Sequence, residues 1–289
     1  MKKISLLFVT AAMLLGLSSC DKEKKEDASG NTSTPLAEIV AGTYSGWTKA
    51  DAAYFSNMVN DEVDQLAITA NSDGTVNVEY TSDTWGKGVF NNIAIAEVSD
   101  KYTFAGEGTI TMASRGGTKD YEGTFEGSVS KDMKSYTVKI VIPSVMGGTT
   151  LTLNPGMAPV NMVVAGQYAG WSSAVFSYAP NGMNNDGDTL RLSANADGTV
   201  NVAYTSATWG NGTFENVVVA RSEEGYTLSE MQGVVAMASR NGEVKEYEVV
   251  LKASTIAADK RSFRFNISVP SVMGGVEITV SEGTAPAEE

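Results

Sequence analysis

The sequence contains no histidine and only one cysteine, Cys20, among its 289 residues. The commonest general base and the commonest zinc ligand in proteins are therefore missing. A lone cysteine cannot form an internal disulfide and offers at most one thiol for catalysis or metal binding. The sequence also lacks a nucleophile elbow, zinc-ligand spacing and a phosphate-binding glycine loop. These absences predict a protein that is not an enzyme and that uses no cofactor or metal. The enzymatic alternative is a carboxylate pair of the glycosidase kind, because acidic residues are plentiful.

Basic residues are scarce as well. The chain has 21 lysines and arginines against 34 acidic residues, for a net charge of −13. An acidic surface favours solubility and opposes binding to a phosphate backbone, so we expect no nucleic-acid partner. Long hydrophobic runs are absent except for residues 4–17, and this run is too short to span a bilayer as a helix.

The first twenty residues read MKKISLLFVTAAMLLGLSSC, in the order of a secretory signal: two lysines, an apolar stretch and small residues. The last four resemble the lipobox of bacterial lipoproteins. That resemblance implies that residues 1–19 are removed and that the Cys20 sulfur carries a diacyl lipid with palmitate-type chains, which anchors the protein to a membrane. Removal of Lys2 and Lys3 changes the net charge from −13 to −15. The alternative is an ordinary cleaved signal followed by an unmodified cysteine.

Residues 20–40 are predicted to be a tether, because a charged run and then small polar residues follow Cys20. The acidic run resembles the surface-export signal of Bacteroidetes lipoproteins, which would place the protein on the cell surface. The alternative is a solvated spacer of any outer-membrane lipoprotein. Both interpretations predict an outer-membrane location.

An internal repeat is the strongest signal after the signal peptide. AGTYSGW (41–47) matches AGQYAGW (165–171), MASRGG (112–117) matches MASRNG (237–242), and PSVMGG occurs at 143–148 and 270–275. The offset grows from 124 to 127 residues, so the copies differ by small insertions only. Each copy is long enough for one domain. We therefore predict a first domain at 41–154, a linker at 155–164, a second domain at 165–282 and a tail at 283–289.

Within each copy apolar and polar residues alternate, as in Leu66, Ile68 and Ala70, and no helical periodicity is evident after the signal. This pattern predicts half-buried antiparallel strands. Asp-Gly pairs at 73–74 and 197–198 predict hairpin turns in which the glycine has a positive φ. We count eight sequential strands per copy. Eight such strands favour a closed up-and-down barrel, with a β-sandwich as the alternative.

Gly42-Thr43-Tyr44 and Gly166-Gln167-Tyr168 open the first strand of each copy. Two barrels of this length with this opening resemble the calycin-like (lipocalin-like) β-barrel domain of Bacteroidetes lipoproteins. Lipocalins proper have Gly-x-Trp at this place, with an arginine from the last strand against the Trp; here the third residue is Tyr and no matching arginine is found. The resemblance therefore implies two tandem barrels and leaves the activity open.

In an up-and-down barrel the loops alternate between two ends. The longest connection (48–63 and 172–188), the Trp-Gly turn, the Ser-Arg turn and PSVMGG all fall at the same end, which we call the mouth. Loops of this length tend to be lids, and aromatic and methionine side chains on them are expected to cover something. We predict ligand-binding mouths formed by Tyr54, Phe55, Met58, Trp85, Arg115 and Met146, and by Phe176, Tyr178, Met183, Trp209, Arg240 and Met273.

Each of these residues has a structural alternative. The tryptophans could plug the barrel end, the methionines could fill the core, and the arginines could be solvated turn residues instead of carboxylate or phosphate ligands. Acidic clusters at 61–64 and 186–188 could hold calcium, but they lack EF-hand spacing and a solvated loop is the simpler interpretation.

The sequence thus predicts a non-enzymatic lipoprotein that binds a small apolar, aromatic or anionic ligand at one or both mouths. The alternative is a protein-interaction or inhibitor-like module with filled barrels. An enclosed pocket under the long connection favours the first function, and a filled interior favours the second.

Overall fold

The computed structural model describes residues 34–238 and 241–286. The predicted signal peptide, the lipidation site Cys20 and the mouth residue Arg240 lie outside the described residues, as does most of the predicted tether. Among the residues described, no helix is both long and apolar enough to cross a bilayer.

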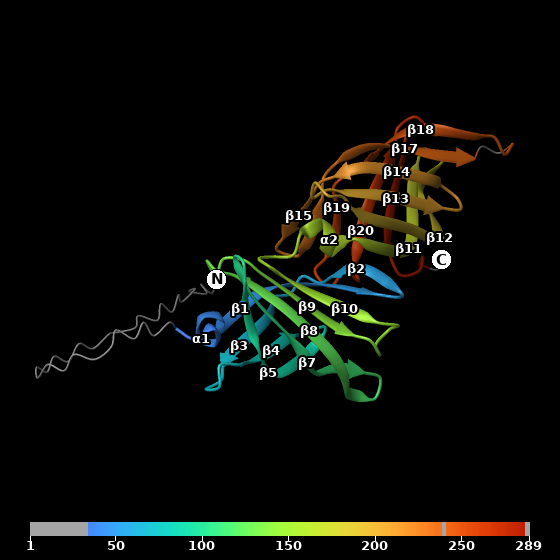
Figure 1. The fold of residues 1–289 in the computed structure, drawn as a ribbon. Helices are drawn as coiled ribbons and strands as arrows, with labels where there is room; N and C mark the ends of the chain where they lie inside the picture. The colour runs from blue at the N-terminus through green and yellow to red at the C-terminus, as the bar shows by residue number, and fades with distance from the viewer. Residues whose placement is uncertain (1–33, 239–240, 287–289) are drawn as a thin grey trace, which may run out of the picture. The chain divides into compact units, whose positions relative to one another are not determined.

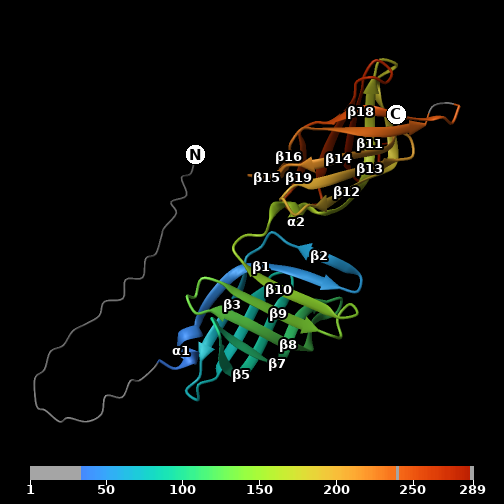
Figure 2. The same ribbon diagram turned by 45° about the horizontal axis from the view of Figure 1, so that its top comes forward.

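The first repeat folds into a closed antiparallel barrel (Figure 1). Eight strands run in sequence order around it, and the last pairs with the first. Figure 2 shows three of them, β8, β9 and β10, side by side in one wall. The elements are α1 Leu36–Val40, β1 Gly42–Ala52, β2 Phe55–Val59, β3 Asp64–Ala70, β4 Val76–Ser82, β5 Gly86–Ile93, β6 Ile95–Val98, β7 Lys101–Ser114, β8 Gly117–Ser130, β9 Tyr136–Ile142 and β10 Thr149–Pro155, with β2 and β6 as extra strands on β1 and β7.

The second repeat forms a second closed barrel, in which β20 and β21 pair and β21 pairs with β11. The fold predicted from the alternating pattern is therefore confirmed, and the predicted turn glycines Gly74 and Gly198 have φ of 86° and 91°. The elements are α2 Val160–Val164, β11 Gly166–Phe176, β12 Ala179–Ala194, β13 Val200–Ser206, β14 Gly210–Val217, β15 Val219–Ser222, β16 Gly225–Leu228, β17 Met231–Ala238, β18 Val244–Leu251, β19 Ser254–Ala257, β20 Phe263–Val269 and β21 Val276–Glu282.

The long connection expected at 48–63 and 172–188 is a strand hairpin in each repeat, so the prediction of a loop there was wrong. Strand β1 continues to Ala52 and pairs with β2 as a hairpin, and β11 pairs with β12 almost to the tip at Phe176 and Ala179. The hairpin in the first repeat breaks before β3, whereas β12 runs on as one strand through a bulge. Gly187 occupies that bulge with φ of 83°, a conformation that the corresponding Val63 cannot adopt without strain.

The second barrel also has a pair of broken strands. The offset between repeats grows by one residue between Tyr226 and Met237 and by one between Tyr247 and Ile256, so each of two paired strands carries an insertion. The breaks separate β16 from β17 and β18 from β19. Side chains satisfy the freed backbone groups: Asn266 Nδ2 donates to Ala253 O (2.8 Å), and Ser254 Oγ donates to Lys252 O (2.9 Å).

Each barrel is preceded by a five-residue helix that packs on its core. Ala37 and Val40 of α1 are buried in the first cluster, so the stretch predicted as a tether ends in ordered structure. Val163 and Val164 of α2 are buried in the second cluster. In both repeats a strand tyrosine donates to the end of the helix: Tyr44 to Val40 O and Tyr168 to Val164 O, each at 2.7 Å.

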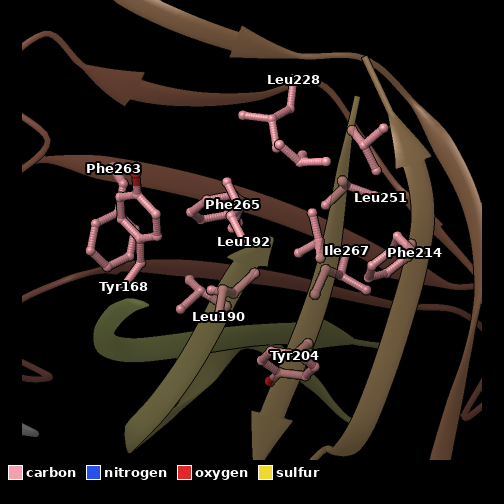
Figure 3. Close-up of a cluster of buried hydrophobic side chains, with 14 of the residues drawn as sticks. Tyr168, Leu190, Leu192, Tyr204, Phe214, Leu228, Leu251, Phe263, Phe265 and Ile267 are labelled. Atoms are coloured by element: carbon pink, nitrogen blue, oxygen red, sulfur yellow. The ribbon is translucent and has the colours of Figure 1, made fainter. Parts of the chain in front are cut away.

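Both barrel interiors are packed with side chains. In the first barrel every one of the eight strands contributes buried apolar residues, and the Phe125 ring lies 5.0 Å from Phe90 and 5.7 Å from Phe104. Figure 3 shows Phe265, Ile267 and Phe214 directed into the second interior from β20 and β14. Burial of this apolar surface is the main stabilising contribution to each barrel.

Candidate functional site

Two aromatic side chains meet at the mouth of each barrel. Trp85 follows β4 and its ring centroid lies 6.1 Å from that of Phe55, at the start of β2. The equivalent Trp209 lies 6.0 Å from Phe176. Both tryptophans are buried, with 5% and 3% of their surface exposed. The tryptophans and the hairpin lie at the same end of each barrel, and the tryptophans are buried against the hairpin aromatics.

A buried polar cluster lies next to Trp85 in the first barrel. Asp64, the first residue of β3, is fully buried, and its Oδ2 accepts a hydrogen bond from Tyr80 Oη (3.1 Å). Thr48 Oγ1 lies 2.8 Å from the same tyrosine oxygen. Ser82 Oγ accepts the backbone N–H of Trp85 at 3.0 Å. Asp64 Oδ1 has no hydrogen-bond partner among the described residues.

Burial sets the electrostatics of this cluster. Loss of hydration raises the pKa of Asp64, and the hydroxyls of Thr48, Ser82 and Tyr80 oppose that rise only in part. The carboxylate of Glu62 raises the pKa of Asp64 further. Burial, with the Asp64 charge nearby, also raises the pKa of Tyr80 well above its ordinary value of 10.0. Tyr80 therefore remains a protonated donor at any physiological pH.

The second barrel repeats the cluster with Asn185 as an added partner, whereas Ser172 Oγ, at the position of Thr48, has no hydrogen-bond partner among the described residues. Tyr204 Oη donates to Asp188 Oδ2 at 2.6 Å, and Asn185 Nδ2 donates to Asp188 Oδ1 at 2.7 Å. Thr208 Oγ1 in turn donates to Asn185 Oδ1 (2.6 Å), which ties the amide to the Trp-Gly turn. Asp188 is as fully buried as Asp64, but both of its oxygens are bonded. Burial raises the pKa of Tyr204, as it does for Tyr80.

Comparison with known proteins supports the fold seen here. A sequence profile for the "Calycin-like beta-barrel domain" matches residues 40–153 and 164–281. The chain belongs to the calycin-like β-barrel family. A search of curated proteins found no match.

Solved structures extend this likeness over both calycin-like barrels. The crystal structure of a protein named "putative outer membrane protein" from Bacteroides fragilis aligns with 86% of this chain and 99% of its own, at 22% identity and a TM-score of 0.61. At that identity the similarity shows the fold alone. A DUF3598 protein of unknown function from Nostoc punctiforme aligns with 87% of this chain and 99% of its own, at 10% identity, and its TM-score of 0.24 supports no argument.

Four further predicted residues, a tyrosine and a methionine in each repeat, lie on the rim of each mouth. Tyr54 and Tyr178, at the hairpin tips, are 83% and 85% exposed. Met146 and Met273 of PSVMGG are 53% and 51% exposed and have positive φ, in turns that close on the next strand. The two loops touch: a β-carbon on Gly147 would lie 3.9 Å from the Tyr54 ring, and Ser177 Oγ donates to Met273 O (2.8 Å).

Three further predicted residues lie away from the aromatic pairs and the rim tyrosines. Met58 and Met183 are exposed on the sides of the hairpins, so they do not fill the core. Arg115 is an exposed residue of the β7–β8 turn. The structure therefore joins the aromatic pairs and the tyrosine–methionine rims, and leaves Arg115 apart from them.

The acidic clusters do not form solvated loops as a whole. Asp61 accepts hydrogen bonds from Arg221 Nε and Tyr226 Oη of the second barrel, both at 2.9 Å, within the compact unit of residues 35–289. The bonds with Arg221 lower the pKa of Asp61. Glu62 accepts from Ser82 Oγ (2.9 Å). Among the described residues, no three acidic or thiol side chains gather to hold a metal ion.

The sequence analysis placed Asp64 and Asp188 in acidic clusters but missed that both side chains are buried. Each stands two positions before a core leucine, Leu66 or Leu190, so the two-residue period places it on the inward face. That parity was available from the sequence. An acidic residue at an inward position, repeated in both copies, is the signal that would have identified the buried cluster.

Proposed function

We propose that this chain is a non-enzymatic outer-membrane lipoprotein, anchored through Cys20, that binds a small apolar or aromatic ligand, with tolerance for an anionic group, at the rims of its two mouths. One observation carries the proposal. Both barrels expose a tyrosine beside an exposed methionine at equivalent places on the rim. Exposed aromatic and methionine side chains are the residue types that recur at adaptable binding surfaces.

The rim is built to hold these side chains outward. A non-glycine residue with positive φ is uncommon, yet Met146 and Met273 both have it. The neighbouring hairpin tip supports the turn through the Ser177–Met273 hydrogen bond in the second barrel. Because Trp85 and Trp209 are buried and the interiors are filled with apolar side chains, we place the ligand on the rim and not inside the barrel.

The proposed location is supported by the lipobox-like ending at Cys20 and by the printed name of the Bacteroides fragilis protein. Its test is replacement of Cys20 by alanine. The variant should leave the membrane fraction and lose incorporation of labelled palmitate, whereas wild-type protein retains both. Continued membrane retention of Cys20→Ala would refute the anchor.

A second function is favoured by the packed interiors. The filled barrels would then act as scaffolds, and their rims would bind another protein as an inhibitor-like or interaction module does. Protein partners would contact the same tyrosines, so the two functions differ in the size of what is bound. Native mass spectrometry of protein isolated from its own host distinguishes a co-purified small molecule from a co-purified polypeptide.

The rim itself is testable with an anionic aromatic dye, 8-anilinonaphthalene-1-sulfonate. Wild-type full-length chain should enhance its fluorescence, and the double variant Tyr54→Ala/Tyr178→Ala should lower the affinity about tenfold or more. Val98→Ala, which shortens an exposed valine on β6, is the matched control and should change nothing. Unchanged dye affinity in the double variant would remove the rim from the account.

A further inference from the structure

A row of side chains crosses the outer face of the second barrel. Backbone pairing places Thr227 opposite Thr255, Thr255 opposite Arg264, Arg264 opposite Ser281, and Ser281 opposite Trp171. Their neighbours along each strand, such as Phe263 and Phe265, are buried. Successive residues of a strand point to opposite faces, so the row faces outward.

The row lies in an open groove of about 850 Å³. Ser281, a small residue, stands between Trp171 and Arg264 in the strand register, and all three line the groove. Trp171 is half-buried and Arg264 is exposed. Among the described residues, Arg264 makes one long hydrogen bond, from Nε to Asn266 Oδ1 at 3.5 Å. Its remaining donors are therefore free to meet a ligand.

The paired insertions distinguish this groove from the corresponding face of the first barrel. They break the strands after β16 and before β19, so the segment β15–β16–β19 joins the barrel through β20. Extra residues of this kind bend strands. The bent segment forms one wall of the groove, and β21 with β11 forms the other.

The first barrel has a smaller depression that shares three equivalent positions with this groove. Thr103, Ser128 and Thr137, the counterparts of Thr227, Thr255 and Arg264, line a depression of about 590 Å³. A depression thus recurs in both repeats, and none of the rim tyrosines or methionines lines it. It has a threonine where the second barrel has Arg264, and Trp47 is not among its lining residues.

The chemistry of the groove indicates its ligand. Hydroxyls that donate and accept (Thr227, Thr255, Ser281) lie between a flat apolar ring and a charged donor, and the acceptors Glu223 and Glu224 stand at its end. A polyanion would be repelled by those carboxylates and by the net charge of −13. A neutral molecule with one apolar ring face and many hydroxyls satisfies both the indole and the hydrogen-bonding groups.

We infer that this outer-face groove of the second barrel binds a neutral oligosaccharide chain, with Trp171 stacking on a sugar ring and Arg264 donating to its oxygens. The groove is open along its length, which suits an extended chain. This site goes beyond the proposed function, since it uses neither rim.

The test is calorimetric titration of the full-length chain, in a zwitterionic detergent that carries no sugar. The probes are hexasaccharides of glucose (two linkages), xylose and N-acetylglucosamine, with hexagalacturonate as the acidic arm. At least one neutral probe should bind with a Kd below about 1 mM, and Trp171→Ala and Arg264→Ala should each weaken it about tenfold or more. Trp171→Phe should retain most of the affinity. Such retention would show that the affinity lost in Trp171→Ala comes from removal of the aromatic ring.

Thr137→Ala, in the corresponding groove of the first barrel, and Tyr54→Ala/Tyr178→Ala, at the rims, are matched controls that should bind as wild type. Failure of every neutral probe overturns the inference, as does exclusive binding of hexagalacturonate or an unchanged Kd in Trp171→Ala. The rim proposal can fail separately, because its dye assay does not involve the groove.

Discussion

The two barrels carry the same buried acid in two different settings. Asp64 has one bonded oxygen and one unpartnered oxygen, whereas Asp188 has both oxygens bonded. The difference traces to one neighbour: Asn185 stands at the position equivalent to Asp61 and donates to Asp188, while Asp61 bonds Arg221 instead. The comparison teaches that a repeated buried charge can be costly in one copy and supported in the other.

The largest expected effect concerns what the two barrels share. Because both interiors are packed, Phe125→Ala in the first and Phe265→Ala in the second should each lower the free energy of unfolding by about 3–5 kcal/mol, since each leaves a cavity. Urea unfolding of the full chain measures this. A loss below about 1 kcal/mol in either barrel would indicate a loose interior with space for a ligand.

The second effect sharpens the contrast between the acids. Asp188→Asn removes the charge that accepts from Asn185 and Tyr204, and hydrogen bonds to a charged group contribute about 1.5–3 kcal/mol. We expect Asp188→Asn to lose about 2 kcal/mol in the free energy of unfolding. Asn185→Ala removes the amide that donates to Asp188 and tests that hydrogen bond separately. An Asn185→Ala variant as stable as wild type would mean that the second cluster gains nothing from Asn185.

A third, smaller effect tests the other difference between the barrels. Gly187→Val places the residue of the first repeat into the bulge of the second. No atom lies within 4 Å of the new β-carbon, so the cost is that of a left-handed backbone alone, about 1–2 kcal/mol. Val63→Gly in the first barrel, where no positive φ is needed, should cost less than about 1 kcal/mol. Equal losses at both positions, measured by thermal unfolding, would contradict the explanation.

Much of the fold was predictable, because strand parity is a local property. Leu66, Ile68 and their counterparts fixed the inward face, and Asp-Gly at the turns fixed the hairpins. The hairpin of β1 and β2 was missed because its tip, Ala53-Tyr54, has none of the residues that mark a tight turn. Helices α1 and α2 were missed because five residues are too few to show a helical period.

The site was predictable only in part. The tryptophans and the rim tyrosines lie at the predicted end because loop alternation follows from topology. The bonding of Asp188 by Asn185 depends on two side chains three residues apart across a bulge, which no period encodes. The outer groove depends on register across five strands and on paired insertions, so it emerges only from the three-dimensional structure.

The central claim is that Asp64 is a charge buried at a cost. Because burial raises the pKa of Asp64 in the folded state, the folded protein loses stability relative to a neutral side chain as pH rises above the ordinary value of 3.8. The decisive measurement is the free energy of unfolding of Asp64→Asn and of wild type from about pH 3.5 to about pH 7.5, a range that begins near the ordinary carboxyl pKa of 3.8. The account predicts a variant close to wild type at the acid end and more stable than wild type at neutral pH. A variant less stable than wild type at neutral pH, as expected for Asp188→Asn, would contradict it.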